Sequence, residues 1–147
     1  MFTLSQHEYL CEYARSQGIE WFATPFHPWA VSFLERAGVK RYKIASRSVR
    51  DIELLKLVSQ TNKPVILSVG GASDRDIKAA INILGRDKTT ILYCVTNYPT
   101  ALEQLDFREF DDLATFGTPV GISLHNPSIW SGIAAVAVPA RYDVGRD

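Results

Sequence analysis

The stretch Arg41-Tyr-Lys-Ile-Ala-Ser46 is a short apolar run that carries one lysine and ends on small residues. Around it the chain repeats one unit, in which an amphipathic helix is followed by a brief β-branched or aromatic run and then by a loop that opens with a polar residue. A lysine inside a buried strand is costly to desolvate unless an anion or a carboxylate meets its charge. Lys43 is therefore the first candidate for a functional residue. The alternative is structural, because a lysine stem can lie along apolar surface while the ammonium reaches water at the strand end.

Five apolar runs predict five strands, which recur at intervals of about 22 to 28 residues, a spacing typical of βα units joined by right-handed crossovers. Periodicity alone does not separate a doubly wound sheet from a (β/α) barrel, but polar residues at every strand end favour the barrel. The expected strands are Ile19–Ala23, Val39–Ala45, Val65–Ser68, Thr90–Val95 and Pro119–Ile122.

Helices are expected between these strands. Ser5 and Glu8 have the spacing of a capping box, which predicts that the first helix begins there, and Gly18 suits its end. Ser73 is expected to begin the helix that follows the third strand. The other helices are expected over residues 29–37, over 51–59, through 107–113 and over 129–138, where Pro139 stops the last one.

The composition is that of an ordinary soluble domain, with 46% hydrophobic and 22% charged residues among 147. The 16 basic and 16 acidic side chains cancel, so we expect neither a nucleic-acid nor a membrane partner, and any anion must be held by a local site. No apolar run approaches the ~20 residues that span a bilayer, and the N-terminus lacks the pattern of a signal peptide, so we expect a cytoplasmic protein. Cys11 and Cys94 are interpreted as small buried hydrophobes.

Polar side chains follow every expected strand. In parallel α/β proteins these positions converge on one face, so hydroxyls and one cation there predict a cradle for phosphate or carboxylate. For each hydroxyl taken singly the alternative is that it caps the following helix. His125 suits a divalent metal, although one histidine is not a metal site and a satisfied loop histidine is the alternative. The candidate residues are Thr24, Lys43, Ser46, Ser68, Thr96, Tyr98, Ser123 and His125.

Five motifs stand in order along the chain: Thr24-Pro-Phe, Tyr42-Lys-Ile-Ala-Ser46, Lys63-Pro-Val-Ile-Leu-Ser-Val-Gly70, Cys94-Val-Thr-Asn-Tyr-Pro-Thr100 and Pro119-Val-Gly-Ile-Ser-Leu-His125. From about Leu4 to Ala140, this series resembles the sialic acid synthase family, which comprises N-acetylneuraminate synthases and related nonulosonate synthases. The resemblance implies an α/β fold that is part of a (β/α)8 TIM barrel, with a partial barrel domain over residues 1–140 and a divergent tail over 141–147.

The resemblance also implies an activity and roles for the candidate residues. Such enzymes are transferases that condense phosphoenolpyruvate with N-acetylmannosamine or a related amino sugar, use Mn or Mg, release phosphate and are usually dimeric. By this resemblance Lys43 and His125 are catalytic, and His125 is the metal ligand. Thr96 and Tyr98 lie where relatives carry polar and sugar-contacting side chains. The groups implied to hold phosphoenolpyruvate are Thr24, Lys43, Ser46, Ser68 and Ser123.

The chain departs from the family pattern in ways that bear on turnover. Relatives carry an acidic residue where this chain has Leu124, and they add a second metal histidine in a strand that is replaced here by residues 142–147. Two barrel strands that would precede Met1 and an antifreeze-like C-terminal domain are expected to be missing. Open sheet edges then predict self-association or a homodimer. Three hypotheses stay open: a synthase that is inactive as this chain, a non-catalytic phosphate-binding or assembly module, and a truncated reading frame without a function of its own.

Overall fold

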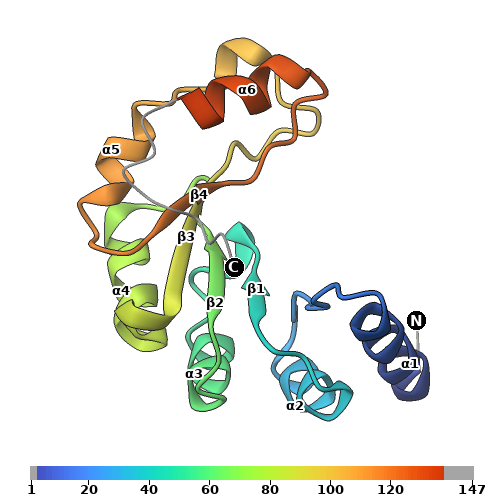
Figure 1. The fold of residues 1–147 in the computed structure, drawn as a ribbon. Helices are drawn as coiled ribbons and strands as arrows, with labels where there is room; N and C mark the ends of the chain where they lie inside the picture. The colour runs from blue at the N-terminus through green and yellow to red at the C-terminus, as the bar shows by residue number, and fades with distance from the viewer. Residues whose placement is uncertain (1–2, 138–147) are drawn as a thin grey trace.

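The computed structural model describes residues 3–137, and its centre is a parallel sheet in the order β1-β2-β3-β4. Each strand therefore pairs with the strand that precedes it in the chain (Figure 1). Lys43 is level with Ile66, and Ser68 with Leu92, so the strand ends form one edge. The strands are β1 (Tyr42–Ile44), β2 (Val65–Ser68), β3 (Thr89–Tyr93) and β4 (Val120–Ile122).

The described part of the chain has six α-helices: α1 and α2 precede β1, and one helix follows each of the four strands. Figure 1 shows α2, α3 and α4 side by side along the sheet with α1 beyond α2, whereas α6 lies past the carboxyl ends of the strands. Short 3-10 turns occupy Ser46–Ser48, Arg86–Lys88 and Leu102–Gln104. The helices are α1 (Leu4–Ser16), α2 (Pro28–Ala37), α3 (Ile52–Gln60), α4 (Asp74–Leu84), α5 (Glu109–Ala114) and α6 (Ile129–Ala137).

The two faces of the sheet differ in burial. Strand side chains alternate in direction, and one set, which includes Tyr42, Leu67 and Ile91, is fully buried in a core with the apolar faces of α3 and α4. The alternate set, which includes Lys43 and Ile66, is only half-buried. In a closed barrel this second face would look inward. The structure thus confirms the expected α/β fold with parallel strands and alternating helices.

The expected first strand, Ile19–Ala23, is wrong: of this segment only Ala23 joins the sheet, through an isolated parallel bridge to Tyr42. Lys43 donates its backbone N–H to the Ala23 carbonyl over 3.3 Å. Ala23 has a neighbouring strand, β1, on one side only. Pro25 and Pro28 follow it closely and have no N–H to donate, so the hydrogen-bonded pairing does not continue beyond Ala23. The described sheet therefore has four strands instead of about five.

The first helix begins earlier than its expected capping box. Thr3, not Ser5, is the N-cap, because the Gln6 amide donates to the Thr3 hydroxyl and the Gln6 side chain accepts from the Thr3 amide. Thr3 and Gln6 have the same three-residue spacing as Ser5 and Glu8, so the pattern fits both pairs. Ser73 caps α4 as expected. None of the helices in residues 3–137 is long and apolar enough to cross a membrane.

Some expectations lie outside the described residues. These are the end of the last helix at Val138 and Pro139, the domain boundary at residue 140, and the tail over 141–147.

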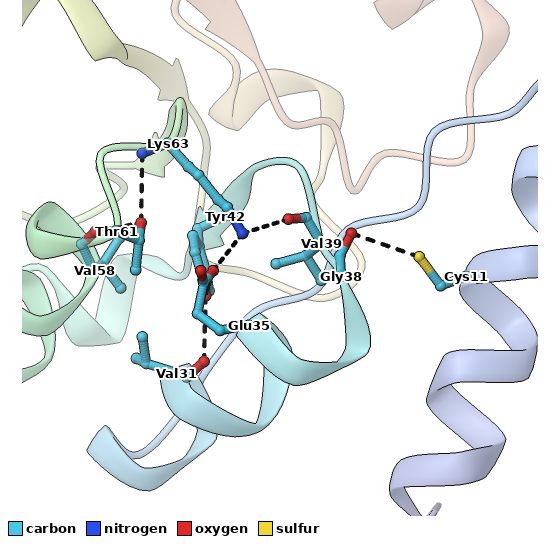
Figure 2. A network of polar contacts seen from close by, with 9 residues as sticks. All are labelled: Cys11, Val31, Glu35, Gly38, Val39, Tyr42, Val58, Thr61 and Lys63. Carbon is cyan, nitrogen blue, oxygen red and sulfur yellow. Dashed lines mark hydrogen bonds and ion pairs between the residues drawn. The ribbon is translucent and has the colours of Figure 1, made fainter.

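A polar network at the amino end of β1 ties the sheet to α2 (Figure 2). The buried Tyr42 hydroxyl donates to Glu35 Oε1 at 2.7 Å, and the Lys63 ammonium donates to the same oxygen at 2.5 Å and to the Val39 carbonyl at 2.7 Å. Burial, followed by the hydrogen bond and the charge of Glu35, raises the pKa of Tyr42 above its usual value. The network fixes the strand that carries Lys43.

Candidate anion site at the carboxyl ends of the strands

Lys43 and Ser68 meet on the half-buried face of the sheet. Lys43 is the middle residue of β1, and its ammonium donates to the hydroxyl of Ser68, the last residue of β2, at 3.0 Å. Ser68 is 3% exposed. The ammonium is therefore held beside a hydroxyl at the strand ends, instead of reaching only solvent. Because the hydroxyl oxygen accepts from Lys43, its own proton stays available to a ligand.

Ser46 lies in the turn that follows β1, and it contacts the loops after β2 and β3. Its hydroxyl oxygen accepts from the Gly70 amide at 3.1 Å and lies 3.2 Å from the Cys94 sulfur. A side chain at Gly70 would collide with Cys94, since its Cβ would lie 2.5 Å from the Cys94 carbonyl oxygen and 2.8 Å from the sulfur. Residues that follow three successive strands thus meet at one hydroxyl.

Ser123 and His125 follow β4 and form a second group with Tyr98. The Ser123 hydroxyl lies 3.4 Å from His125 Nε2, and the rings of Tyr98 and His125 are 4.3 Å apart between centroids. The Thr100 amide donates to the His125 carbonyl at 3.0 Å. The loops after β3 and β4 are therefore held together. Tyr98 remains 72% exposed, so most of its side chain is accessible.

Thr24 and Thr96 line two different cavities. Thr24 lies with Phe26, Trp29 and Phe33 around a cavity of about 450 Å³ between α2 and the loop before it. Thr96 lines a cavity of about 680 Å³ between α4 and α5. Among the described residues 3–137, neither threonine has a side-chain hydrogen bond to Lys43, Ser46 or Ser68, although Thr96 lies beside Gly70.

The rim of the 680 Å³ cavity is acidic. Asp74, Asp106, Glu109 and Asp112 all line it. Hydrogen bonds from Arg108 lower the pKa of the Asp106 carboxyl to about 2. Burial raises the pKa of Tyr93, whose hydroxyl oxygen accepts from the Asp106 amide at 2.9 Å. Its acidic rim makes the cavity itself a poor receptor for anions, although Gly70 and Cys94, which contact Ser46, also line it.

The described residues do not form a metal centre by themselves. Residues 3–137 contain no group of three His, Cys, Asp or Glu side chains that could hold a metal ion. The His125 side chain contacts the Ser123 hydroxyl and the Tyr98 ring, neither of which is an acidic, thiol or imidazole ligand. A divalent ion at His125 would need ligands from outside this range.

Gly70 and Cys94 are the two site residues that sequence reasoning missed. Gly70-Gly71 predicts only a tight turn, and Cys94 only a buried hydrophobe, which its 9% exposure confirms. Cys94 directly follows β3, at the same kind of position as Ser46 and Ser123. Its position directly after a strand could have identified Cys94 as a site residue from the sequence.

Comparisons with known proteins place this geometry in a family. The sequence profile of the NeuB family matches residues 1–142. The chain is 33% identical to the N,N'-diacetyllegionaminic acid synthase of Campylobacter jejuni over 143 residues, which is 93% of this chain and 43% of that synthase. It is 32% identical to a pseudaminic acid synthase of the same organism over 139 residues, covering 92% and 40%.

A solved structure agrees with the sequence relatives. The N-acetylneuraminic acid synthetase of Leptospira borgpetersenii, determined in complex with citrate, has a TM-score of 0.87 and 30% identity over 92% of this chain and 48% of its own. A truncated 3-deoxy-D-arabino-heptulosonate 7-phosphate synthase of Thermotoga maritima shares the fold, with a TM-score of 0.65 and 16% identity, over 83% of this chain and 49% of its own. The chain thus spans less than half the length of these relatives. Profile, sequence and structure agree: the chain belongs to the NeuB family of sialic acid synthases.

Proposed function

We propose that this chain forms the phosphoenolpyruvate-binding part of a sialic acid (N-acetylneuraminate-type) synthase. The reaction joins C3 of phosphoenolpyruvate to the aldehyde carbon of N-acetylmannosamine or a related amino sugar, adds water at C2 and releases phosphate. The observation that carries the proposal is the hydrogen bond from the Lys43 ammonium to Ser68 at the strand ends. It places a cation and an available hydroxyl proton where barrel enzymes bind their substrates.

The chemistry of this group suits a phosphate ester. An ammonium supplies a point charge, and the Ser46 and Ser68 hydroxyls supply directed hydrogen bonds to phosphate or carboxylate oxygens. The half-buried face lowers the local dielectric constant, which strengthens both the attraction of the ammonium for the ligand and the hydrogen bonds of the hydroxyls. The solved relative from Leptospira was determined with citrate, another polyanion, which agrees with an anion-binding family.

The sugar is proposed to lie near Tyr98 and His125. Tyr98 presents an exposed ring beside the His125 imidazole, and rings of this kind stack on sugars while the phenol and the imidazole offer hydrogen bonds. A divalent ion, Mn or Mg, is proposed to polarise the aldehyde in the whole enzyme. Within residues 3–137 only the His125 imidazole is proposed as a ligand for it, since no group of three His, Cys, Asp or Glu side chains lies together there.

A second candidate is a non-catalytic phosphate-binding or assembly module derived from the same barrel. Residues 3–137 contain no group of three His, Cys, Asp or Glu side chains that could hold a metal ion, which supports anion binding without turnover by these residues. Self-association is proposed as well, because one sheet face is half-buried and α6 exposes Ile129, Trp130 and Val136 by 74%, 69% and 82%.

Thermal unfolding with added ligand tests the proposal, since a ligand that binds only the folded chain raises its melting temperature. Phosphoenolpyruvate should raise the melting temperature of the purified chain in a saturable manner, and more than inorganic phosphate does at equal concentration. Turnover with N-acetylmannosamine, followed by phosphate release, separates the two candidates. A cooperative melt that phosphoenolpyruvate leaves unchanged would refute both of them.

A further inference from the structure

The hydrogen-bond pattern around Ser46 distinguishes it from an ordinary surface serine. A hydroxyl has one proton to donate and two lone pairs that accept. The Ser46 oxygen accepts from the Gly70 amide at 3.1 Å and lies 3.2 Å from the Cys94 sulfur, a pair in which either atom can donate. If the thiol donates, both lone pairs of Ser46 are occupied by protein donors.

We propose that Gly70 and Cys94 are positioning residues that hold the Ser46 hydroxyl as a donor to an anionic ligand. The inference rests on the proposed function, because the anion is phosphoenolpyruvate. With its lone pairs taken by the Gly70 amide and the Cys94 thiol, the hydroxyl has only its proton left for the ligand. Donors that bond to an oxygen also polarise its O–H bond and strengthen the bond that it donates.

Ser68 shows the same arrangement, with a different donor. Its hydroxyl oxygen accepts from the Lys43 ammonium at 3.0 Å, so its proton is likewise available. Two hydroxyls of the site therefore accept from the protein and offer their protons to the ligand. This polarity suits an acceptor-only ligand such as phosphate or carboxylate, and it disfavours a cation.

Gly70 is needed for this contact because of its size. Its backbone angles are not in the left-handed region, and the added Cβ would lie 2.5 Å from the Cys94 carbonyl oxygen and 3.0 Å from Thr96 Cγ2. The carbonyl belongs to the backbone and cannot rotate away. Any side chain at this position must push the loops after β2 and β3 apart, which withdraws the amide from Ser46.

Binding measurements test the positioning role. Gly70→Ala should weaken phosphoenolpyruvate binding about tenfold, as Ser46→Ala should, since each removes one hydrogen bond to a charged ligand. The double variant should bind phosphoenolpyruvate with about the same affinity as the single variant that binds it less tightly, because both changes remove the same interaction. Gly132→Ala is the matched control, as its Cβ would meet nothing within 4 Å. Additive losses in the double variant would overturn the role of Gly70.

Substitutions of Cys94 separate donation from packing. Cys94→Ser keeps a donor and should retain binding within about twofold, whereas Cys94→Ala should lose about fivefold. Equal affinities of these two variants would overturn the role of the thiol, because only the serine variant keeps a group that can donate at the position of the thiol.

Amide exchange tests the geometry without a ligand. The Gly70 amide should exchange with solvent deuterium more slowly in the wild type than in Ser46→Ala, by at least about tenfold. Equal rates would overturn the proposed contact. If the wild type fails to bind phosphoenolpyruvate while the exchange of the Gly70 amide still depends on Ser46, the proposed function is refuted. The contact between the Gly70 amide and the Ser46 hydroxyl is then still supported.

Discussion

Lys43 donates to Ser68 across β1 and β2 at 3.0 Å, on the face of the sheet opposite α3 and α4. The contact joins the middle of one strand to the carboxyl end of the next. It therefore converts a lysine that looks out of place in an apolar strand into one half of a pair that can meet an anion.

Lys43→Ala should weaken phosphoenolpyruvate binding more than His125→Ala, because the Lys43 ammonium still neutralises the charge of the ligand when the imidazole is lost. The expected loss for Lys43→Ala is on the order of 10- to 100-fold, the range for hydrogen bonds to charged groups. Isothermal titration measures it. Lys56→Ala removes an exposed lysine of α3 and serves as the control. Wild-type affinity in the Lys43 variant would remove that lysine from the site.

Binding of Mn²⁺ by this chain should be weak and should depend on His125. Residues 3–137 offer no group of three ligating side chains, so His125 contributes a single imidazole. Paramagnetic resonance should show Mn²⁺ binding no tighter than that of free imidazole, and none in His125→Ala. His27→Ala, in a loop distant from β4 along the chain, is the control. Tight binding that persists in His125→Ala would place the metal elsewhere.

Tyr42→Phe should lower the free energy of unfolding at neutral pH by about 1–3 kcal/mol, because it removes a buried hydrogen bond to the charged Glu35. Chemical denaturation measures this loss. Tyr9→Phe, at an exposed tyrosine of α1, should change little.

The same tyrosine gives a pH dependence. The folded chain raises the pKa of Tyr42 above its usual 10.0, so the folded state binds that proton more tightly than the unfolded state does. The stability that this proton contributes to the folded state is fully present below pH 10, the usual pKa of tyrosine, and is lost as the pH rises above that value. Unfolding free energies measured between pH 9 and 11 should fall more steeply for the wild type than for Tyr42→Phe. Parallel curves would contradict the raised pKa.

Val136→Lys should reduce self-association of the chain. Val136 is 82% exposed on the apolar helix α6, and burying a lysine against an apolar partner is costly. Sedimentation velocity over a range of concentrations measures the effect. Gln17→Lys adds the same charge at the exposed end of α1 and should leave association unchanged. A monomeric wild type at all concentrations would rule out this interface.

Residues that meet their partners within one βα unit or across adjacent buried strands were predictable from sequence. Val65–Ser68 forms a strand with the expected bounds, because its apolar residues are enclosed by neighbours on both sides. Ile19–Ala23 is also largely apolar, but only Ala23 pairs with β1, and a sequence pattern does not report how many neighbouring strands a segment has. In the site, the positions of Lys43 and Ser68 near the carboxyl ends of two parallel strands predict that these side chains lie close together. The meeting of Ser46 with Cys94 depends on how closely two loops approach at Gly70, a distance that no periodicity encodes.

The order of the strands in the sheet bears on how the chain acquires its structure during synthesis. Each strand pairs with the one before it, so every new strand finds its partner already made, and contacts between segments close in sequence form fast. Pulse-labelling hydrogen exchange should show β1 and β2 protected no later than β4, and earlier protection of β4 would contradict this order. A sheet assembled in this way can grow from its N-terminal side as residues leave the ribosome, without waiting for segments that are translated later.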